Sequence, residues 1–132
     1  VGAEFVDFDT ILKESDFVTI HTALTPETHH LFNAATFAKM KRTAILINTS
    51  RGGTVDQDAL YSALVNNTIA GAGLDVTVPE PLPVDHPLLK LANCIVLPHI
   101  ASASYATRTK MAMLAAENVL AGVKGQPLPN PV

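Results

Sequence analysis

Arg51, Glu80 and His99 are three side chains whose types together suit one reaction. Arg holds a carboxylate through two parallel hydrogen bonds, a geometry that Lys does not offer. His is a common proton donor in enzymes near neutral pH, and a neighbouring carboxylate favours its imidazolium form and fixes the orientation of its ring. The set therefore fits the addition of a hydride and a proton to the carbonyl group of a 2-oxo acid.

Each of these residues also has a plainer explanation. Arg51 could cap a helix end or pair with Asp56. Glu80 taken alone could be a solvated loop charge, and His99 a structural histidine with satisfied hydrogen bonds. The catalytic interpretation is favoured by position, because each of the three residues follows the end of a predicted strand.

Four short and nearly continuous apolar runs predict those strands, at residues 17–21, 44–48, 69–75 and 94–97. Such runs are typical of parallel strands that are covered on both faces. Arg51 follows the second run, Glu80 the third and His99 the fourth. Since parallel strands end at one edge of their sheet, and ligands bind at that edge, we expect the three side chains to lie along it.

Helix signals alternate with the strands. Asp9 and Asn33 can each cap a short helix, and Asp56 opens a helix to about residue 66. A long helix follows Ser104 and runs to about residue 124. Gly125 and the proline-rich residues after it end the last helix. The alternation predicts an α/β fold with a doubly wound parallel sheet of about four strands and right-handed crossovers.

Composition bounds the class of protein. The chain has 132 residues, of which 48% are hydrophobic and 16% charged, with a net charge of −3. These values exclude a disordered tail and a nucleic-acid-binding arm, and no apolar run approaches the roughly 20 residues of a membrane-spanning helix. The single cysteine, Cys94, excludes an intrachain disulfide, fits a cytoplasmic location and is expected to be an inert core thiol. The histidines show no zinc-ligand spacing.

The glycines do not form a phosphate-binding loop. Gly71 and Gly73 resemble the start of a G-x-G-x-x-G motif, but the last glycine is missing and the pair lies within a predicted strand. We interpret both as close-packing residues. A hydrolase that uses Ser50 with His99 and Asp75 is disfavoured because the chain has no G-x-S-x-G motif.

Four motifs in order resemble the D-isomer-specific 2-hydroxyacid dehydrogenases, over nearly the whole chain. They are Leu-Thr-Pro-Glu-Thr at 24–28, Asn-Thr-Ser-Arg-Gly at 48–52, Gly-Leu-Asp-Val at 73–76 leading to Pro-Glu-Pro at 79–81, and Leu-Pro-His-Ile at 97–100. Within that family, residues 75–83 and 86–89 look most like the members that reduce glyoxylate and hydroxypyruvate.

The resemblance implies a Rossmann-type fold and assigns roles to individual residues. It implies a catalytic set of Arg51, Glu80 and His99, a small 2-oxo acid as substrate, and NAD or NADP as cofactor, with NADPH slightly favoured. It implies a homodimer formed through the nucleotide-binding domains, and no nucleic-acid or membrane partner. The residues implied to contact the cofactor are Leu24, Thr25, Thr49, Ser50, Arg51, Asp75, His99, Ala101 and Ser102.

Two departures from the family pattern qualify these expectations. Ala101 stands where many members have glycine, and family chains are more than twice this length. We therefore expect residues 1–124 to be part of an NAD(P)-binding domain whose glycine-rich loop lies upstream, and residues 125–132 to be a tail towards a substrate domain. Two alternatives remain: a non-enzymatic, NAD-responsive regulator like the family's corepressors, and an inactive fragment that only dimerises.

Overall fold

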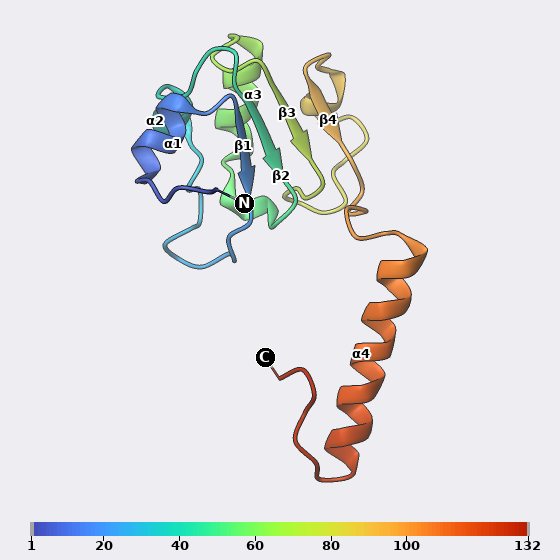
Figure 1. The fold of residues 1–132 in the computed structure, drawn as a ribbon. Helices are drawn as coiled ribbons and strands as arrows, with labels where there is room; N and C mark the ends of the chain where they lie inside the picture. The colour runs from blue at the N-terminus through green and yellow to red at the C-terminus, as the bar shows by residue number, and fades with distance from the viewer. Residues whose placement is uncertain (1, 132) are drawn as a thin grey trace. The chain divides into compact units, whose positions relative to one another are not determined.

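The computed structural model describes residues 2–131, which form two compact units, residues 2–99 and residues 100–131. The first unit contains one parallel sheet in the order β1-β2-β3-β4 (Figure 1). Its strands are β1 (Phe17–Ile20), β2 (Ile45–Asn48), β3 (Gly71–Leu74) and β4 (Cys94–Val96). The sheet confirms the predicted Rossmann-type α/β class and the positions of all the predicted strands, with slightly shorter bounds.

Helices alternate with these strands along the chain. The first unit contains α1 (Phe8–Glu14), α2 (Ala34–Phe37), α3 (Gln57–Val65) and two short 3₁₀ helices, η1 (Gly52–Thr54) and η2 (Pro87–Lys90). The second unit contains α4 (Tyr105–Val123), and Gly125 has a positive φ of 65° just beyond it. Within that unit the tail is held to the helix by Asn118, whose side-chain amide makes two hydrogen bonds with the main chain of Asn130.

Of the two residues predicted as helix caps, Asn33 is confirmed and Asp9 is wrong, and the helices predicted to begin at Asp56 and after Ser104 do begin there. Asn33, Asp56 and Ser104 each accept hydrogen bonds from backbone N–H groups of the first turn. The cap of α1 is Asp7 instead of Asp9. The Asp7 carboxylate accepts from the N–H of Thr10 at 2.7 Å, which holds the pKa of Asp7 below its ordinary value.

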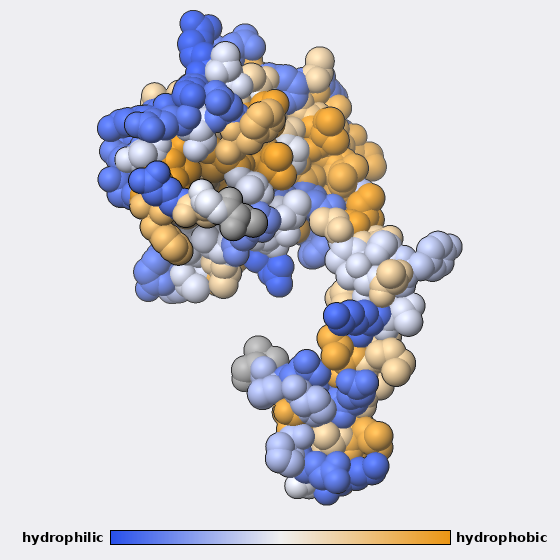
Figure 2. All heavy atoms as spheres, viewed as in Figure 1, coloured by the Kyte–Doolittle hydropathy of each residue, from blue (hydrophilic) through white to orange (hydrophobic). Residues whose placement is uncertain are grey.

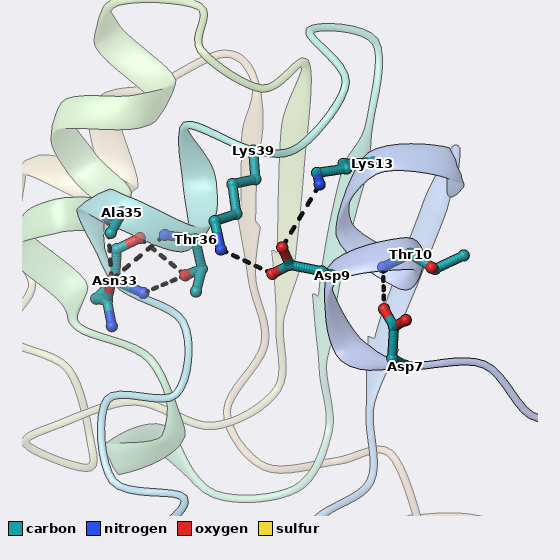
Figure 3. A network of polar contacts seen from close by, with 8 residues as sticks. All are labelled: Asp7, Asp9, Thr10, Lys13, Asn33, Ala35, Thr36 and Lys39. Atoms are coloured by element: carbon teal, nitrogen blue, oxygen red, sulfur yellow. Dashed lines mark hydrogen bonds and ion pairs between the residues drawn. The ribbon is translucent and has the colours of Figure 1, made fainter.

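Asp9 lies within the first turn of α1 and has a different role (Figure 3). Its carboxylate accepts a hydrogen bond from Lys39 at 2.7 Å and forms an ion pair with Lys13 at 3.5 Å, and the Lys39 bond lowers the pKa of Asp9. Asp7 and Asp9 are two residues apart, and the extended backbone of Asp7 just before α1 is what makes it the cap.

The core of the first unit lies on one face of the sheet. Side chains from α1, α2 and α3, such as Leu12, Phe37 and Leu60, pack with Leu46 and Leu74 of the strands. The prediction that both faces are covered is wrong for residues 2–99, because every one of these helices contributes to the same cluster.

The opposite face of the sheet leaves apolar side chains in contact with solvent. Paired residues on adjacent strands share a face, so the register places Phe17 beside Ile45, and Ile47 in one row with Gly73 and Ile95. Phe17 is 68% exposed and Ile95 is 66% exposed. Figure 2 shows hydrophobic side chains gathered over the strands.

The two glycines of β3 differ in their surroundings. A Cβ on Gly71 would come within 3.2 Å of the Asn93 carbonyl oxygen, whereas a Cβ on Gly73 would meet nothing within 4 Å. The close-packing interpretation therefore holds for Gly71 and is wrong for Gly73. In the neighbouring strand, Cys94 is partly buried rather than fully buried, and this burial raises the pKa of its thiol to about 11.

A close backbone contact joins the loops that follow β2 and β3. Gly52 packs so tightly on Thr77 that a Cβ there would lie 2.2 Å from the Thr77 carbonyl oxygen. Both residues are buried. The contact sets Arg51, just before Gly52, and Glu80, three residues after Thr77, on two loops that are fixed against each other.

The exposed sheet face leads to a first prediction. Contiguous exposed apolar surface promotes association, so the 132-residue chain should show an apparent mass that rises with concentration in light scattering. The double variant Phe17→Thr/Ile95→Thr should reduce that rise, because Thr keeps the strand preference while removing most of the apolar area. Val84→Thr, at a loop residue that is 95% exposed, serves as the control. A wild-type chain that stays monomeric at every concentration would contradict this interpretation.

The contact at Gly52 leads to a second prediction. Gly52→Ala should lower the free energy of unfolding by about 1–3 kcal/mol, because the added methyl group forces two backbones apart. Gly73→Ala, with open space at its Cβ, should leave that free energy unchanged or raise it by up to about 1 kcal/mol. Urea unfolding of the two variants measures the difference, and equal stabilities would show that the loops move apart at little cost.

Candidate active site

The loop that carries Arg51 is organised by Asn48, the last residue of β2, whose side chain is fully buried. Its Nδ2 donates to the Arg51 carbonyl oxygen at 2.9 Å and to Thr54 Oγ1 at 3.2 Å. Its Oδ1 accepts from the N–H of Ser50 at 3.0 Å and from Ser50 Oγ at 2.9 Å. One amide thus fixes the turn at residues 49–51 and satisfies its own buried polar atoms. Asn48 is not among the site residues that the sequence predicts, although a polar residue at the end of an apolar strand is a usable signal.

Arg51 extends from this turn with an exposed side chain. Its Nη1 donates to the Ser50 carbonyl oxygen at 2.7 Å. The alternative that Arg51 caps a helix or pairs with Asp56 gains no support within residues 2–131. Arg51 precedes η1 without a side-chain capping bond, and Asp56 instead caps α3 by accepting from the N–H groups of Asp58 and Ala59.

Glu80 and His99 are in direct contact. His99 Nδ1 is hydrogen-bonded to Glu80 Oε1, and the N–H of Thr77 donates to Glu80 Oε2 at 3.4 Å. The side chains of His99 and Glu80 are 51% and 38% exposed, so a ligand can reach both. Because Glu80 contacts Nδ1, Nε2 is the nitrogen that can give a proton to a bound molecule.

The backbone of Asp75 links the His99 segment to the sheet. Asp75 directly follows β3 and is buried, with 4% of its surface exposed. Its N–H donates to the carbonyl oxygen of Asn48 at 2.9 Å, and its own carbonyl oxygen accepts from the N–H of His99 at 3.0 Å. The ends of β2 and β3 and the residue His99 beyond β4 are therefore joined by consecutive backbone hydrogen bonds.

A hollow of about 540 Å³ lies beside Arg51. It brings together four of the predicted cofactor-contacting residues, which are Leu24, Thr49, Ser50 and Arg51 itself. His21 lines the same hollow while its Nε2 is hydrogen-bonded to Thr19 Oγ1 at 2.9 Å. Since hydroxyl groups and a cation gather here at the carboxyl ends of β1 and β2, the hollow suits a polar ligand with an anionic part.

The other predicted contact residues lie elsewhere. Thr25 follows Leu24, and its N–H donates to Thr28 Oγ1 at 2.8 Å within a local turn. Ala101 and Ser102 belong to the second unit. A separate hollow of about 430 Å³ includes Glu80 in its wall and is lined mostly by apolar side chains, such as Leu82 and Leu89.

Two general features complete the description. Among residues 2–131, no group of three or more His, Cys, Asp and Glu side chains is arranged to hold a metal ion. Within the same residues, none of the helices is long and apolar enough to cross a membrane.

Known proteins have sequences similar to this chain. The chain is 55% identical over 128 residues to human glyoxylate reductase/hydroxypyruvate reductase, a match that covers 97% of this chain and 39% of that protein. It is 54% identical over 130 residues to the glyoxylate reductase of Korarchaeum cryptofilum, a match that covers 98% of this chain and again 39% of the relative. The chain therefore spans about two fifths of the length of these relatives.

Solved structures agree with the sequence matches. The crystal structure of TT0316 protein from Thermus thermophilus matches with a TM-score of 0.94 and 52% identity, over 100% of this chain and 42% of that one. A D-isomer specific 2-hydroxyacid dehydrogenase from Lactobacillus delbrueckii ssp. bulgaricus, in its NAD complexed form, matches with a TM-score of 0.87 and 34% identity, over 98% and 43%. A dehydrogenase of the same description from Xanthobacter autotrophicus Py2, in complex with NADPH and MES, matches with a TM-score of 0.78 and 41% identity, over 94% and 50%.

A sequence model of a protein family also matches most of the chain. The model described as D-isomer specific 2-hydroxyacid dehydrogenase, NAD binding domain, matches residues 1–101, which include Arg51, Glu80 and His99. This confirms the resemblance that the motifs indicated. The chain belongs to the D-isomer specific 2-hydroxyacid dehydrogenase family, within its NAD-binding domain.

Proposed function

We propose that the protein containing this chain reduces a small 2-oxo acid, glyoxylate or hydroxypyruvate, to the 2-hydroxy acid with NADH or NADPH. The observation that carries this proposal is the contact between Glu80 and Nδ1 of His99, which leaves Nε2 for proton transfer. A regulator that only senses a dinucleotide needs residues that bind the cofactor but no proton donor. The paired imidazole therefore favours a reductase.

In this mechanism each of the three residues has one task. When bound, the reduced nicotinamide supplies the hydride that forms the new C–H bond at the oxo carbon. His99 gives the proton from Nε2 to the carbonyl oxygen, and the Glu80 carboxylate holds the ring and stabilises its protonated form. Arg51 binds the substrate carboxylate through its guanidinium, which presents two parallel donors.

The cofactor would lie at the sheet edge beside Arg51. The residues there fit one part of a dinucleotide, since Thr49 and Ser50 offer hydroxyl groups in a hollow of about 540 Å³. We propose further contacts from Leu24, Thr25, Asp75 and the segment after His99 at Ala101 and Ser102. The hollow suits NAD and NADP alike, and the resemblance slightly favours NADPH. A cytoplasmic homodimer formed through the nucleotide-binding domains completes the proposal.

A segment exchange tests the proposed function. In the exchange enzyme, the 132 residues of this chain replace the matched segment of the human relative, which supplies the remaining regions. We expect this enzyme to oxidise NADPH or NADH when hydroxypyruvate or glyoxylate is added. His99→Ala should then lower kcat by about 10²–10⁴, the usual contribution of a general acid. His29→Ala, at an exposed histidine that stacks on His30, should leave kcat unchanged.

Two results would overturn the proposal. One is a folded exchange enzyme without activity on either acid, and the other is full activity in its His99→Ala form. The 132-residue chain alone provides a further control. We expect it to bind NADH and NADPH weakly in calorimetric titration and to reduce neither acid. A dinucleotide's pyrophosphate binds at the N-terminus of the helix that follows a glycine-rich loop, and that loop is not among the 132 residues.

A further inference from the structure

The loop that carries Glu80 has few backbone donors of its own. Pro79, Pro81 and Pro83 alternate with other residues along it, and proline lacks the N–H group that would anchor a main chain. The loop must therefore be held by side chains or by the residues at its ends. Glu80 itself contributes one anchor, since its Oε2 accepts from the N–H of Thr77.

Gln57 supplies the anchor at the start of this loop. Its side-chain amide makes two hydrogen bonds with the main chain of Val78: Oε1 accepts from the N–H of Val78 at 2.8 Å, and Nε2 donates to the Val78 carbonyl oxygen. Gln57 is the first residue of α3, which Asp56 caps and which Leu60 fixes in the core with no exposed surface. A rigid helix thus holds Val78 at both of its main-chain polar groups.

The contacts continue from Val78 to the proton donor. Thr77 is buried, and its N–H donates to Glu80 Oε2 while its Oγ1 donates to the Pro79 carbonyl oxygen at 2.9 Å. Glu80 Oε1 in turn contacts Nδ1 of His99. Fixing Val78 between Thr77 and Pro79 therefore fixes the carboxylate that orients the imidazole.

We infer that Gln57 is a positioning residue for the proposed reduction, acting on His99 through Val78 and Glu80. The inference rests on the proposed function and adds a residue that is hydrogen-bonded to Val78 rather than to Glu80 or His99 themselves. A Gln57 with a merely structural role would affect stability and leave the Glu80–His99 pair untouched. The two roles are therefore separated by measuring whether the effect of a Gln57 substitution on kcat depends on the presence of the Glu80 carboxylate.

Kinetics of the exchange enzyme provide the first test. Gln57→Ala should lower kcat by roughly 10- to 100-fold, the scale on which small misplacements of a catalytic group act, with little change in the KM for the cofactor. Asn118→Ala is the matched control, because Asn118 also makes two amide hydrogen bonds with one main-chain residue, in the second unit. It should leave kcat unchanged. Gln57→Met takes the place of Gln57→Ala if the latter folds poorly. Met is similar in length to Gln but lacks the amide, so this variant should show the same loss of kcat.

A double-mutant cycle tests the route through Glu80. In a Glu80→Gln background the carboxylate is already gone, so adding Gln57→Ala should change kcat by less than about 2-fold, because residues in one network are not additive. An equal loss of kcat in both backgrounds would overturn the inference. So would an active exchange enzyme in which Gln57→Ala and Gln57→Met behave like Asn118→Ala.

An NMR measurement on the 132-residue chain decides the question without any activity. The side-chain ¹⁵N shifts of His99 report which ring nitrogen is hydrogen-bonded, so Gln57→Met should change the Nδ1 shift while Asn118→Ala should not. Unchanged His99 shifts in Gln57→Met would overturn the inference. An exchange enzyme that is inactive while these shifts move as expected would overturn the proposed function alone.

Discussion

The arrangement of the candidate site depends on one buried side-chain amide. Asn48 ends β2 with no exposed surface, and its amide binds backbone or side-chain atoms of Ser50, Arg51 and Thr54. Each polar group of a buried amide that lacked a hydrogen-bond partner would destabilise the fold by about 1–3 kcal/mol. The turn after β2 is therefore determined by the need to supply hydrogen-bond partners to the Asn48 amide. The position of Arg51 therefore follows from the hydrogen-bond requirement of a residue outside the proposed catalytic set.

The same edge of the sheet shows why backbone groups, more than side chains, connect the site. The carbonyl oxygen of Asn48 accepts from Asp75, and the carbonyl oxygen of Asp75 accepts from His99. Gly52 meets the main chain of Thr77 at a distance that no side chain allows. These contacts hold three loops in place with little dependence on surface residues, and they leave the side chains of Arg51 and His99 accessible to a ligand.

Much of this was predictable from sequence patterns, because the patterns report local requirements. Apolar runs located the strands, and the strand ends located Arg51, Glu80 and His99. Contacts between distant segments leave no such pattern. The helix cap at Asp7 required the backbone conformation, and the one-sided core required the packing of the helices. The paired hydrogen bonds of Gln57 to a residue 21 positions away required the folded loop.

The backbone of His99 carries a further sign of how the site is held. His99 has a φ of 56°, in the left-handed region that residues with a Cβ rarely adopt. Such a conformation costs of order 1–3 kcal/mol and persists only where surrounding contacts determine it. Here two contacts do so, the N–H bond to Asp75 and the Nδ1 bond to Glu80. This backbone region is not confined to His99, since His30 and Asn67 also have a φ of 51°. What distinguishes His99 is that its main chain and its ring are each hydrogen-bonded to a residue that follows β3. The conformation of His99 is therefore determined by the segment after β3, which also carries the carboxylate that orients its ring.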